Sequence, residues 1–133
     1  MIIMIGGSRG WDDTEIIAQI VSGLKEQDVV IHGNCPNSPD IIVGKMSKSR
    51  GLVVGEFPYV SQKGKVGGHI RNRVMVDIAD GCIFFWNGKS QGTAKTINYA
   101  RDKGKLLQVI VEGQNNQAID DIMKALFNEE NDK

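Results

Sequence analysis

Three short apolar segments of this sequence each end in a loop that combines glycine with polar or charged side chains. The loops cover residues 6–11, 32–34 and 87–93, and a helical pattern follows each of them. In a parallel α/β sheet such loops meet at one edge, outside the carboxyl ends of the strands, where ligands bind. Glycine lets backbone N–H groups approach a ligand closely, and a helix N-terminus behind the loop favours an anion. The spacing therefore predicts a site for a phosphorylated ligand.

The first loop places Gly6 and Gly7 before Ser8 and Arg9. It offers backbone N–H groups, a hydroxyl and a guanidinium, and arginine can hold phosphate through two parallel hydrogen bonds. The equal alternative is a plain strand-to-helix turn with an arginine at the surface. The loop contains neither the G-x-G-x-x-G dinucleotide fingerprint nor the G-x-x-x-x-G-K-[ST] phosphate loop.

The third loop carries the stronger signal. Ser90, Gly92 and Thr93 follow Gly88 at the start of a predicted helix, where they supply two hydroxyls and backbone N–H donors that the helix leaves unsatisfied. Simple capping of the helix by Ser90 or Thr93 is the alternative. Gly33, in the second loop, is assigned to the same ligand site.

The segment 67–73 is basic and begins with a pair of glycines, Gly67 and Gly68. Glycine is unfavourable inside a helix, so a pair at its start indicates a close approach of the backbone to another group. Arg71 would point toward the sheet edge and supply charge, and Asn72 would bind a base, a ribose or a neighbouring loop. A solvated basic helix is the alternative.

Two carboxylates are candidates for catalysis, Asp40 at the start of a predicted helix and Glu56 near the end of a strand. Either would approach a ribose carbon or a ribose hydroxyl. The alternatives are stabilisation of the helix dipole by Asp40 and an exposed strand-end position for Glu56. His32 is a candidate base or a hydrogen-bonded structural residue. Trp11 and Trp86 are candidates for stacking on a base, although Trp86 is expected to pack beneath its loop.

The elements that must position these residues alternate along the chain. Hydrophobic patterns and capping residues predict strands at 2–5, 28–32, 52–57, 81–86 and 106–111, with helices at 13–25, 38–51, from about 67, at 91–103 and at 115–127. The helix from about 67 is expected to turn Ile70, Val74, Met75 and Ile78 inward. This order predicts a single Rossmann-like α/β domain over residues 1–127, a three-layer α/β/α arrangement around a five-stranded parallel sheet, with a polar tail at 128–133.

The composition excludes several classes of protein. The chain has 16 basic and 16 acidic residues in 133, so it lacks the broad positive field that drives nonspecific nucleic-acid binding. No apolar run approaches the roughly 20 residues that span a membrane, and we expect a cytoplasmic protein without a signal peptide. Cys82 is expected in the core and Cys35 as an exposed thiol. No residues have metal-ligand spacing, and no cofactor is expected.

Taken in order, these residues resemble the SLOG superfamily, and more narrowly its small bacterial and phage branch of single-domain proteins. The superfamily includes the Lonely Guy-type phosphoribohydrolases, formerly called lysine decarboxylases, and the Rossmann-like domain of the DNA-processing protein A. The resemblance covers roughly residues 1–111. It is carried by Gly6-Gly7-Ser8-Arg9, His32-Gly33 with Asp40, Arg71-Asn72 with Met75 and Ala79-Asp80, and the segment from Phe85 through Ser90-x-Gly92-Thr93. It implies a nucleotide or nucleotide-derived ligand at the carboxyl edge of the sheet.

Two departures from the family pattern bear on the function. The glycine-rich run that usually follows His32-Gly33 is replaced here by a stiffer segment, 34–40, with two prolines. The phosphoribohydrolases carry a glutamate three residues after their Gly-Thr pair, and the matching residue here is Thr96. A threonine cannot replace a carboxylate in acid–base work, so the phosphoribohydrolase reaction by that mechanism is not expected.

Three functions therefore stay open. The first is a binding or sensing module for a small nucleotide-like ligand, without turnover. The second is an N-glycosidase that uses Asp40 or Glu56. The third is a protein-interaction domain with a vestigial pocket. Exposed apolar residues on the helices beside the site would permit a homodimer.

Overall fold

The structure is a computed structural model, and it describes residues 1–58 and 64–113. The predicted helix at 115–127 and the tail at 128–133 lie outside the described residues. Within the described part, no helix has both the length and the apolar character needed to cross a membrane.

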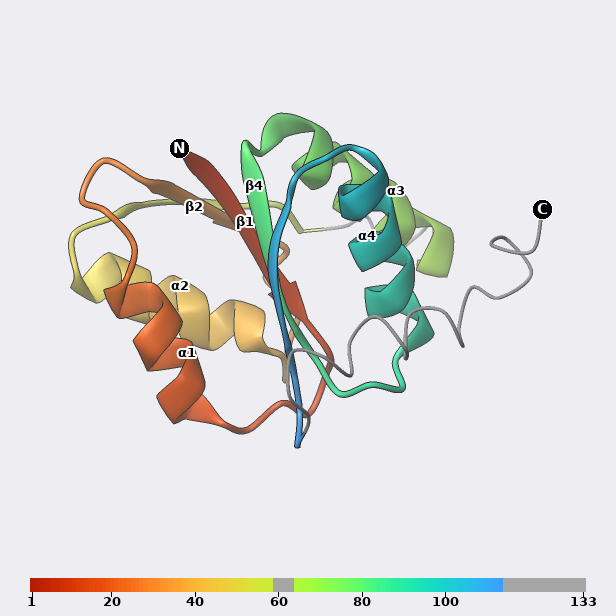
Figure 1. The fold of residues 1–133 in the computed structure, drawn as a ribbon, viewed down its shortest axis with the longest axis horizontal. Helices are drawn as coiled ribbons and strands as arrows, with labels where there is room; N and C mark the ends of the chain where they lie inside the picture. Colours follow the sequence, from red (N-terminus) through yellow and green to blue (C-terminus); the bar gives the residue numbers. More distant parts are fainter. Residues whose placement is uncertain (59–63, 114–133) are drawn as a thin grey trace.

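The described residues form one five-stranded sheet in which all neighbouring strands are parallel (Figure 1). Its spatial order is β3-β2-β1-β4-β5, so the chain starts in the centre and builds outward in both directions. The parallel five-stranded sheet predicted from the sequence is confirmed. The strands are β1 (Ile2–Gly7), β2 (Val29–His32), β3 (Val53–Glu56), β4 (Gly81–Trp86) and β5 (Leu106–Val111).

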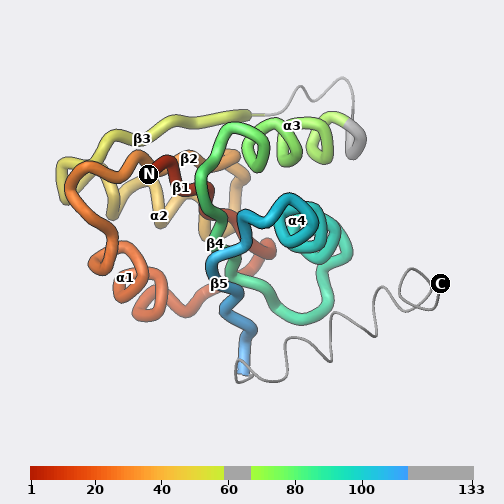
Figure 2. Tube along the Cα trace, turned by 45° about the horizontal axis from the view of Figure 1, so that its top comes forward, coloured from red at the N-terminus to blue at the C-terminus, as the bar shows by residue number. Residues whose placement is uncertain are grey.

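The helices of the described part cover the sheet on both faces, which confirms the three-layer arrangement. Figure 2 shows α1 and α2 on one side of the sheet and α3 and α4 on the other. A separate hydrophobic core lies on each face. The helices are α1 (Thr14–Ser22), α2 (Pro39–Ser49), α3 (Gly64–Ile78) and α4 (Gln91–Asp102).

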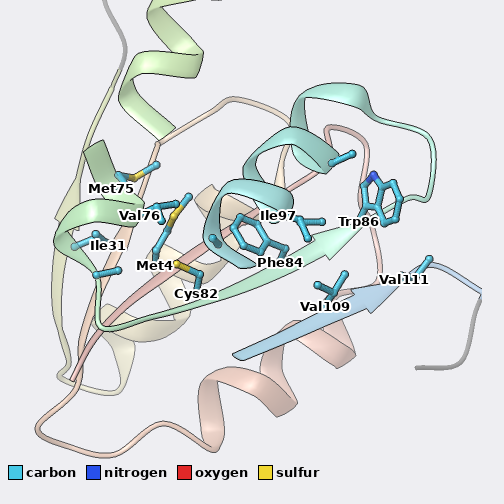
Figure 3. Packing of buried hydrophobic residues seen from close by; sticks show 13 residues of the cluster. Met4, Ile31, Met75, Val76, Cys82, Phe84, Trp86, Ile97, Val109 and Val111 are labelled. Carbon is cyan, nitrogen blue, oxygen red and sulfur yellow. The ribbon is translucent and has the colours of Figure 1, made fainter. Parts of the chain in front are cut away.

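The two cores follow from the alternation of side chains along the central strands. In β4, Cys82 and Phe84 join the core under α3 and α4 (Figure 3), whereas Ile83 and Phe85 join the core under α1 and α2. All six residues of this strand are buried. A central strand that is covered on both faces must be apolar throughout, which is why its bounds could be predicted from sequence.

Short-range capping sets most of the helix ends. The Asp13 side chain accepts a hydrogen bond from the Ile16 N–H, and Ser38 caps α2 just before Pro39. Gly51 follows α2 with a φ of 80°, a left-handed conformation that suits glycine at a helix C-terminus.

Helix α1 ends earlier than the predicted residue 25. Gly23 is its C-cap, and the Arg50 guanidinium reaches from the end of α2 to donate to the carbonyls of Val21 and Leu24. The Val21 carbonyl also accepts the Leu24 N–H at 3.2 Å, so the guanidinium adds a second hydrogen bond to it and ties the segment after α1 to the end of α2.

The predicted inward face of α3 is wrong in part. Ile70, Val74 and Ile78 are 48%, 43% and 44% exposed, whereas Met75 is buried. The helix instead turns Met75, Val76 and the following Ala79 toward the core. Two apolar stripes run along this helix, and they are offset by one residue, which is about 100° around the helix axis. Packing of α3 against β1 and α4 decides which of the two stripes is buried.

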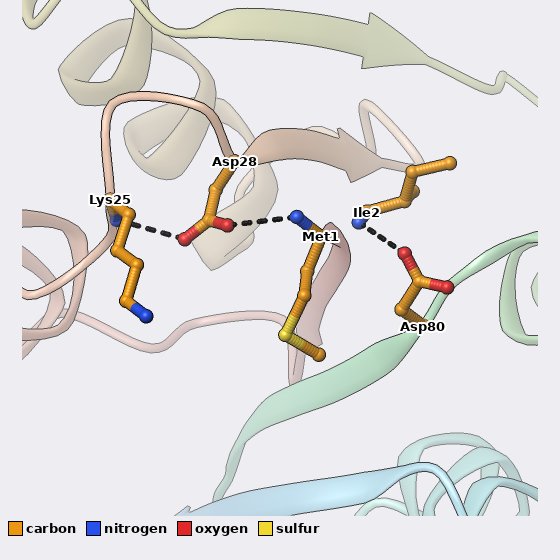
Figure 4. Close-up of polar contacts among 5 residues, drawn as sticks. All are labelled: Met1, Ile2, Lys25, Asp28 and Asp80. Atoms are coloured by element: carbon orange, nitrogen blue, oxygen red, sulfur yellow. Dashed lines mark hydrogen bonds and ion pairs between the residues drawn. The ribbon is translucent and has the colours of Figure 1, made fainter.

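The amino ends of the strands are held by polar contacts at the edge opposite the glycine-containing loops (Figure 4). The amino group of Met1 lies 3.0 Å from Asp28 Oδ1, and the Ile2 N–H donates to Asp80 Oδ2 at 2.7 Å. A hydrogen bond from the Lys25 N–H and the neighbouring amino group lower the pKa of Asp28. The start of β1 is thereby fixed between β2 and β4.

Candidate functional site

A wide cleft of about 810 Å³ opens at the carboxyl edge of the sheet. Its walls come from the loops after β1, β2 and β4, from residues 68–72 of α3 and from the start of α4, at the edge where the topology predicts a site. Among the predicted ligand-binding residues, seven line this cleft: Gly7, Arg9, Arg71, Asn72, Ser90, Gly92 and Thr93. His69 and Lys95, which are not among the residues predicted for the site, line it as well.

A smaller chamber of about 60 Å³ adjoins the cleft. Gly7, Cys35, Arg71, Asn72 and Thr93 line both spaces. The chamber adds the predicted residues Gly6, Gly33 and Asp40, together with Thr96 and the apolar side chains of Met4, Met75 and Phe84. The site therefore has a broad polar mouth and a narrow inner compartment.

Ser8 lies beside this site without lining either space. It is 1% exposed, its Oγ accepts a hydrogen bond from the Asn87 N–H at 3.1 Å, and it lies 3.4 Å from Thr93 Oγ1. The predicted phosphate-binding hydroxyl thus ties the loop after β1 to the loop after β4. Its environment supports a bracing role rather than direct contact with a ligand.

The loop before α4 is closed by its own hydrogen bonds. Ser90 is the N-cap, with its Oγ 3.4 Å from the Thr93 N and 3.2 Å from Thr93 Oγ1, so the capping role considered from the sequence is confirmed. Asn87 Oδ1 accepts from the N–H groups of Lys89 and Ser90, both at 2.8 Å. Gly88, in the middle of this turn, has a φ of 78° and lines neither space.

Arg71 reaches from α3 to the loops that follow β2 and β3. Its Nη1 donates to the carbonyls of Gly33 at 2.7 Å and Phe57 at 3.0 Å, and its Nη2 lies 3.2 Å from Cys35 Sγ. A Cβ atom on Gly33 would lie 2.3 Å from Nη1, so glycine at that position leaves room for the guanidinium. The solvated basic helix considered from the sequence is therefore wrong for Arg71, which lines the site and joins its walls.

Asn72 connects the two helices on the same side of the cleft. Its Oδ1 accepts from Arg71 Nε at 2.7 Å, and its Nδ2 donates to Thr96 Oγ1 at 3.2 Å. The Thr96 hydroxyl in turn donates to the Gly92 carbonyl at 3.1 Å. Thr96 is thus a buried hydroxyl that is hydrogen-bonded to both α3 and α4.

Asp40 is the buried carboxyl group of the chamber. It is 4% exposed, and its Oδ2 accepts from the Cys35 N–H at 3.1 Å. Its Oδ1 is buried and has no hydrogen-bond partner among the described residues. Burial raises the pKa of Asp40. The residue belongs to the first turn of α2, as predicted, but its environment is the chamber rather than solvent.

The structure does not bring Glu56 to the site. Its carboxylate lies at the exposed end of β3, 3.0 Å from Lys48 Nζ, and it lines neither the cleft nor the chamber. The hydrogen bond from Lys48 lowers the pKa of Glu56. The exposed strand-end position considered from the sequence is confirmed.

His32 is a structural residue at the end of β2. It is 1% exposed, and its Nδ1 accepts from the Asn34 N–H at 3.0 Å. Its Nε2 has no partner in the described part of the chain and faces α2, where a Cβ atom on Gly44 would lie 2.6 Å away. Burial lowers the pKa of His32 below the ordinary 6.5, so the folded state favours the neutral ring.

This buried histidine predicts acid sensitivity. A group whose pKa falls on folding binds its proton more tightly in the unfolded chain, so its contribution to stability is complete above about pH 6.5 and is lost as the pH falls below that value. The His32→Asn variant should lose less free energy of unfolding between about pH 7 and pH 5 than the wild type, because the amide does not titrate yet can accept from Asn34. Urea unfolding at both pH values measures the difference.

The raised pKa of Asp40 acts in the opposite direction, since it favours the folded state as the pH falls. His32 lowers the pKa of Asp40 electrostatically, so its removal raises that pKa further. This second effect also reduces the stability that the variant loses as the pH falls, and it therefore adds to the expected difference. An equal pH dependence in the wild type and the variant would contradict the assignment of acid sensitivity to His32.

Both tryptophans pack inside the protein, so stacking of either ring on a base is not supported. Trp86 is 0% exposed and donates from Nε1 to the Ser90 carbonyl at 3.0 Å, as expected for packing beneath the loop. Trp11 is buried with its ring 5.4 Å from that of Phe85.

The cysteines differ in environment. Cys82 is buried in the core, as predicted, and desolvation raises its pKa to about 11. Cys35, predicted to be exposed, is half-buried at the rim shared by the two spaces. Among residues 1–58 and 64–113, no three His, Cys, Asp or Glu side chains form a group that could hold a metal ion.

Comparisons of the chain with models of protein families, with curated proteins and with solved structures found no match. Membership of the SLOG superfamily therefore stays a prediction from the residues quoted above. The candidate site is defined by its geometry, which is a wide cleft at the carboxyl edge of the sheet and a small chamber with a buried carboxyl group.

Proposed function

We propose that this protein is a SLOG-type module that binds a nucleotide or a nucleotide-derived phosphorylated ligand in the wide cleft. The observation that carries the proposal is the meeting of Arg9, Lys95 and the first turn of α4 around a single space of about 810 Å³. This volume lies within the range of about 300–1,000 Å³ that is typical of small-molecule sites.

The electrostatics of the cleft favour an anionic group. The first turn of α4 carries the positive end of the helix dipole, and that turn contains no acidic residue. Arg9 is exposed and close to the backbone of Gly7, which also lines the cleft. A phosphate held there would receive a guanidinium, an ammonium and backbone N–H donors together.

Titration calorimetry with AMP and ADP-ribose tests this proposal. Arg9→Gln and Lys95→Gln should each weaken binding roughly three- to tenfold, because each removes one charged contact to phosphate. Arg101→Gln and Lys45→Gln are the matched controls, since these exposed side chains do not line the cleft. Equal weakening by the controls, or no binding by the wild type, would contradict the proposal.

An N-glycosidase is the second candidate, and Asp40 is the observation that favours it. A carboxyl group whose pKa is raised by burial can donate a proton to a departing base, and Asp40 lines the inner chamber. Glu56 is not a catalytic residue in this second candidate function, because it lines neither the cleft nor the chamber. Chromatography of the same mixtures separates the two functions: intact ligand after binding supports the binding module, and free base supports the enzyme. The homodimer stays a prediction.

A further inference from the structure

The inner chamber contains a hydrogen-bond acceptor that the fold itself does not use. Asp40 is 4% exposed, and its Oδ1 has no partner among the described residues, although its Oδ2 is bonded to the Cys35 N–H. A buried carboxylate oxygen without a partner is costly, and such atoms are normally paired with a protein group, water or a ligand. Asp40 lines the chamber, and a rotation of its carboxyl group would bring the unused oxygen to a donor that enters this space.

The charges around the chamber restrict what that donor can be. A phosphate would meet the carboxyl group of Asp40, and an ammonium group would meet the guanidinium of Arg71, which lines the same space. Both charged groups are therefore disfavoured by a like charge in a partly desolvated compartment. A neutral hydrogen-bond donor is therefore compatible with both Asp40 and Arg71.

The size and the other walls favour hydroxyl groups. A chamber of about 60 Å³ has room for roughly four water molecules, which is too small for a whole nucleobase. The side-chain amide of Asn72 and the hydroxyl groups of Thr93 and Thr96 also line it. The Thr96 hydrogen is already donated to the Gly92 carbonyl. A hydroxyl can donate to a carboxylate and accept from an amide N–H at the same time. Carboxylates serve the same purpose where dinucleotide-binding folds hold a ribose.

We propose that the inner chamber receives the 2′,3′-hydroxyl edge of a pentose, with Asp40 Oδ1 as its acceptor, while the phosphate of the same ligand stays in the wide cleft. The assignment rests on the proposed function and narrows it to ribose-containing ligands. It makes Asp40 a specificity-determining residue that distinguishes ribose from deoxyribose.

The test compares AMP with 2′-deoxy-AMP, and ribose 5-phosphate with 2-deoxyribose 5-phosphate, by titration calorimetry. The wild type should prefer each ribose compound by about tenfold, the value of one hydrogen bond to a charged group. Asp40→Asn should bring this preference close to unity and leave the affinity for the deoxy compounds within about threefold. The asparagine can keep the bond from Cys35 through its own carbonyl oxygen.

Asp80→Asn is the matched control, since it makes the same change at the opposite edge of the sheet, where Asp80 accepts from Ile2. It should retain the full preference. The comparison of ribose and deoxyribose compounds in the wild type needs no variant. It therefore tests the assignment even if Asp40→Asn does not fold.

The outcomes separate this assignment from the proposed function. If the wild type binds the phosphorylated compounds without preferring ribose, or if Asp40→Asn keeps the preference, the assignment is overturned and the binding function stands. If none of the phosphorylated compounds binds, the proposed function fails and the assignment falls with it.

Discussion

An alanine at position 7 is expected to lower the free energy of unfolding by about 3 kcal/mol, at the upper end of the range for overpacked sites. A Cβ atom there would lie 2.5 Å from the Phe85 carbonyl oxygen and 2.8 Å from Pro39 Cγ. The Phe85 carbonyl also accepts the Ser8 N–H at 2.9 Å. The added methyl group can be accommodated only by moving the backbone of β4 or the start of α2, and either movement disturbs the cleft.

Urea unfolding of Gly7→Ala and Gly10→Ala measures this effect against a matched control. Gly10 has a φ of 81°, and a Cβ atom there would meet no other atom of the described residues within 4 Å. Its alanine variant should lose about 1–2 kcal/mol from backbone strain alone. If Gly7→Ala loses no more free energy of unfolding than Gly10→Ala, then the close approach of β1 to β4 and α2 is not the reason that position 7 requires glycine.

The parts of the fold that could be predicted from sequence are those fixed by local patterns. The strands at 81–86 and 106–111 and the helix beginning at Gln91 were predicted with the bounds or starts that the structure gives them. A continuous apolar run sets the strand at 81–86, and an apolar segment interrupted by Gln108 sets the strand at 106–111. A serine cap with a glycine-containing loop sets the helix. The topology of parallel strands then brings the predicted loops to one edge without any knowledge of individual contacts.

The parts that could not be predicted depend on contacts between distant residues. Ser8 was expected to face a ligand, but its hydroxyl bonds instead to the loop after β4, at Asn87, 79 positions further along the chain. The exposure of Ile70 on α3 was missed because two adjacent apolar stripes compete for the core. The unpartnered oxygen of Asp40 has no sequence signal, since it follows from how the loop at Cys35 folds over α2.

The second large effect is expected at Arg71, the side chain that holds the loops after β2 and β3 against α3. Arg71→Ala should lower the free energy of unfolding by roughly 2–4 kcal/mol, because the carbonyls of Gly33 and Phe57 lose a charged donor. Arg71→Lys should recover little of this loss, since a single ammonium cannot reproduce the planar guanidinium that also meets Asn72 and Cys35. Urea unfolding of the three proteins measures both differences.

Gly33→Ala gives an independent test of the same contact. Its Cβ atom would lie 2.3 Å from Arg71 Nη1, so the variant should displace the guanidinium and lose about 2 kcal/mol in the wild-type background. When Arg71 is already alanine, the clash disappears and the added loss should be small. A double-mutant cycle should therefore show a coupling of about 1–3 kcal/mol between the two positions. Additive losses would mean that Arg71 does not occupy the space that Gly33 leaves open, and that the wall between chamber and cleft is held by other contacts.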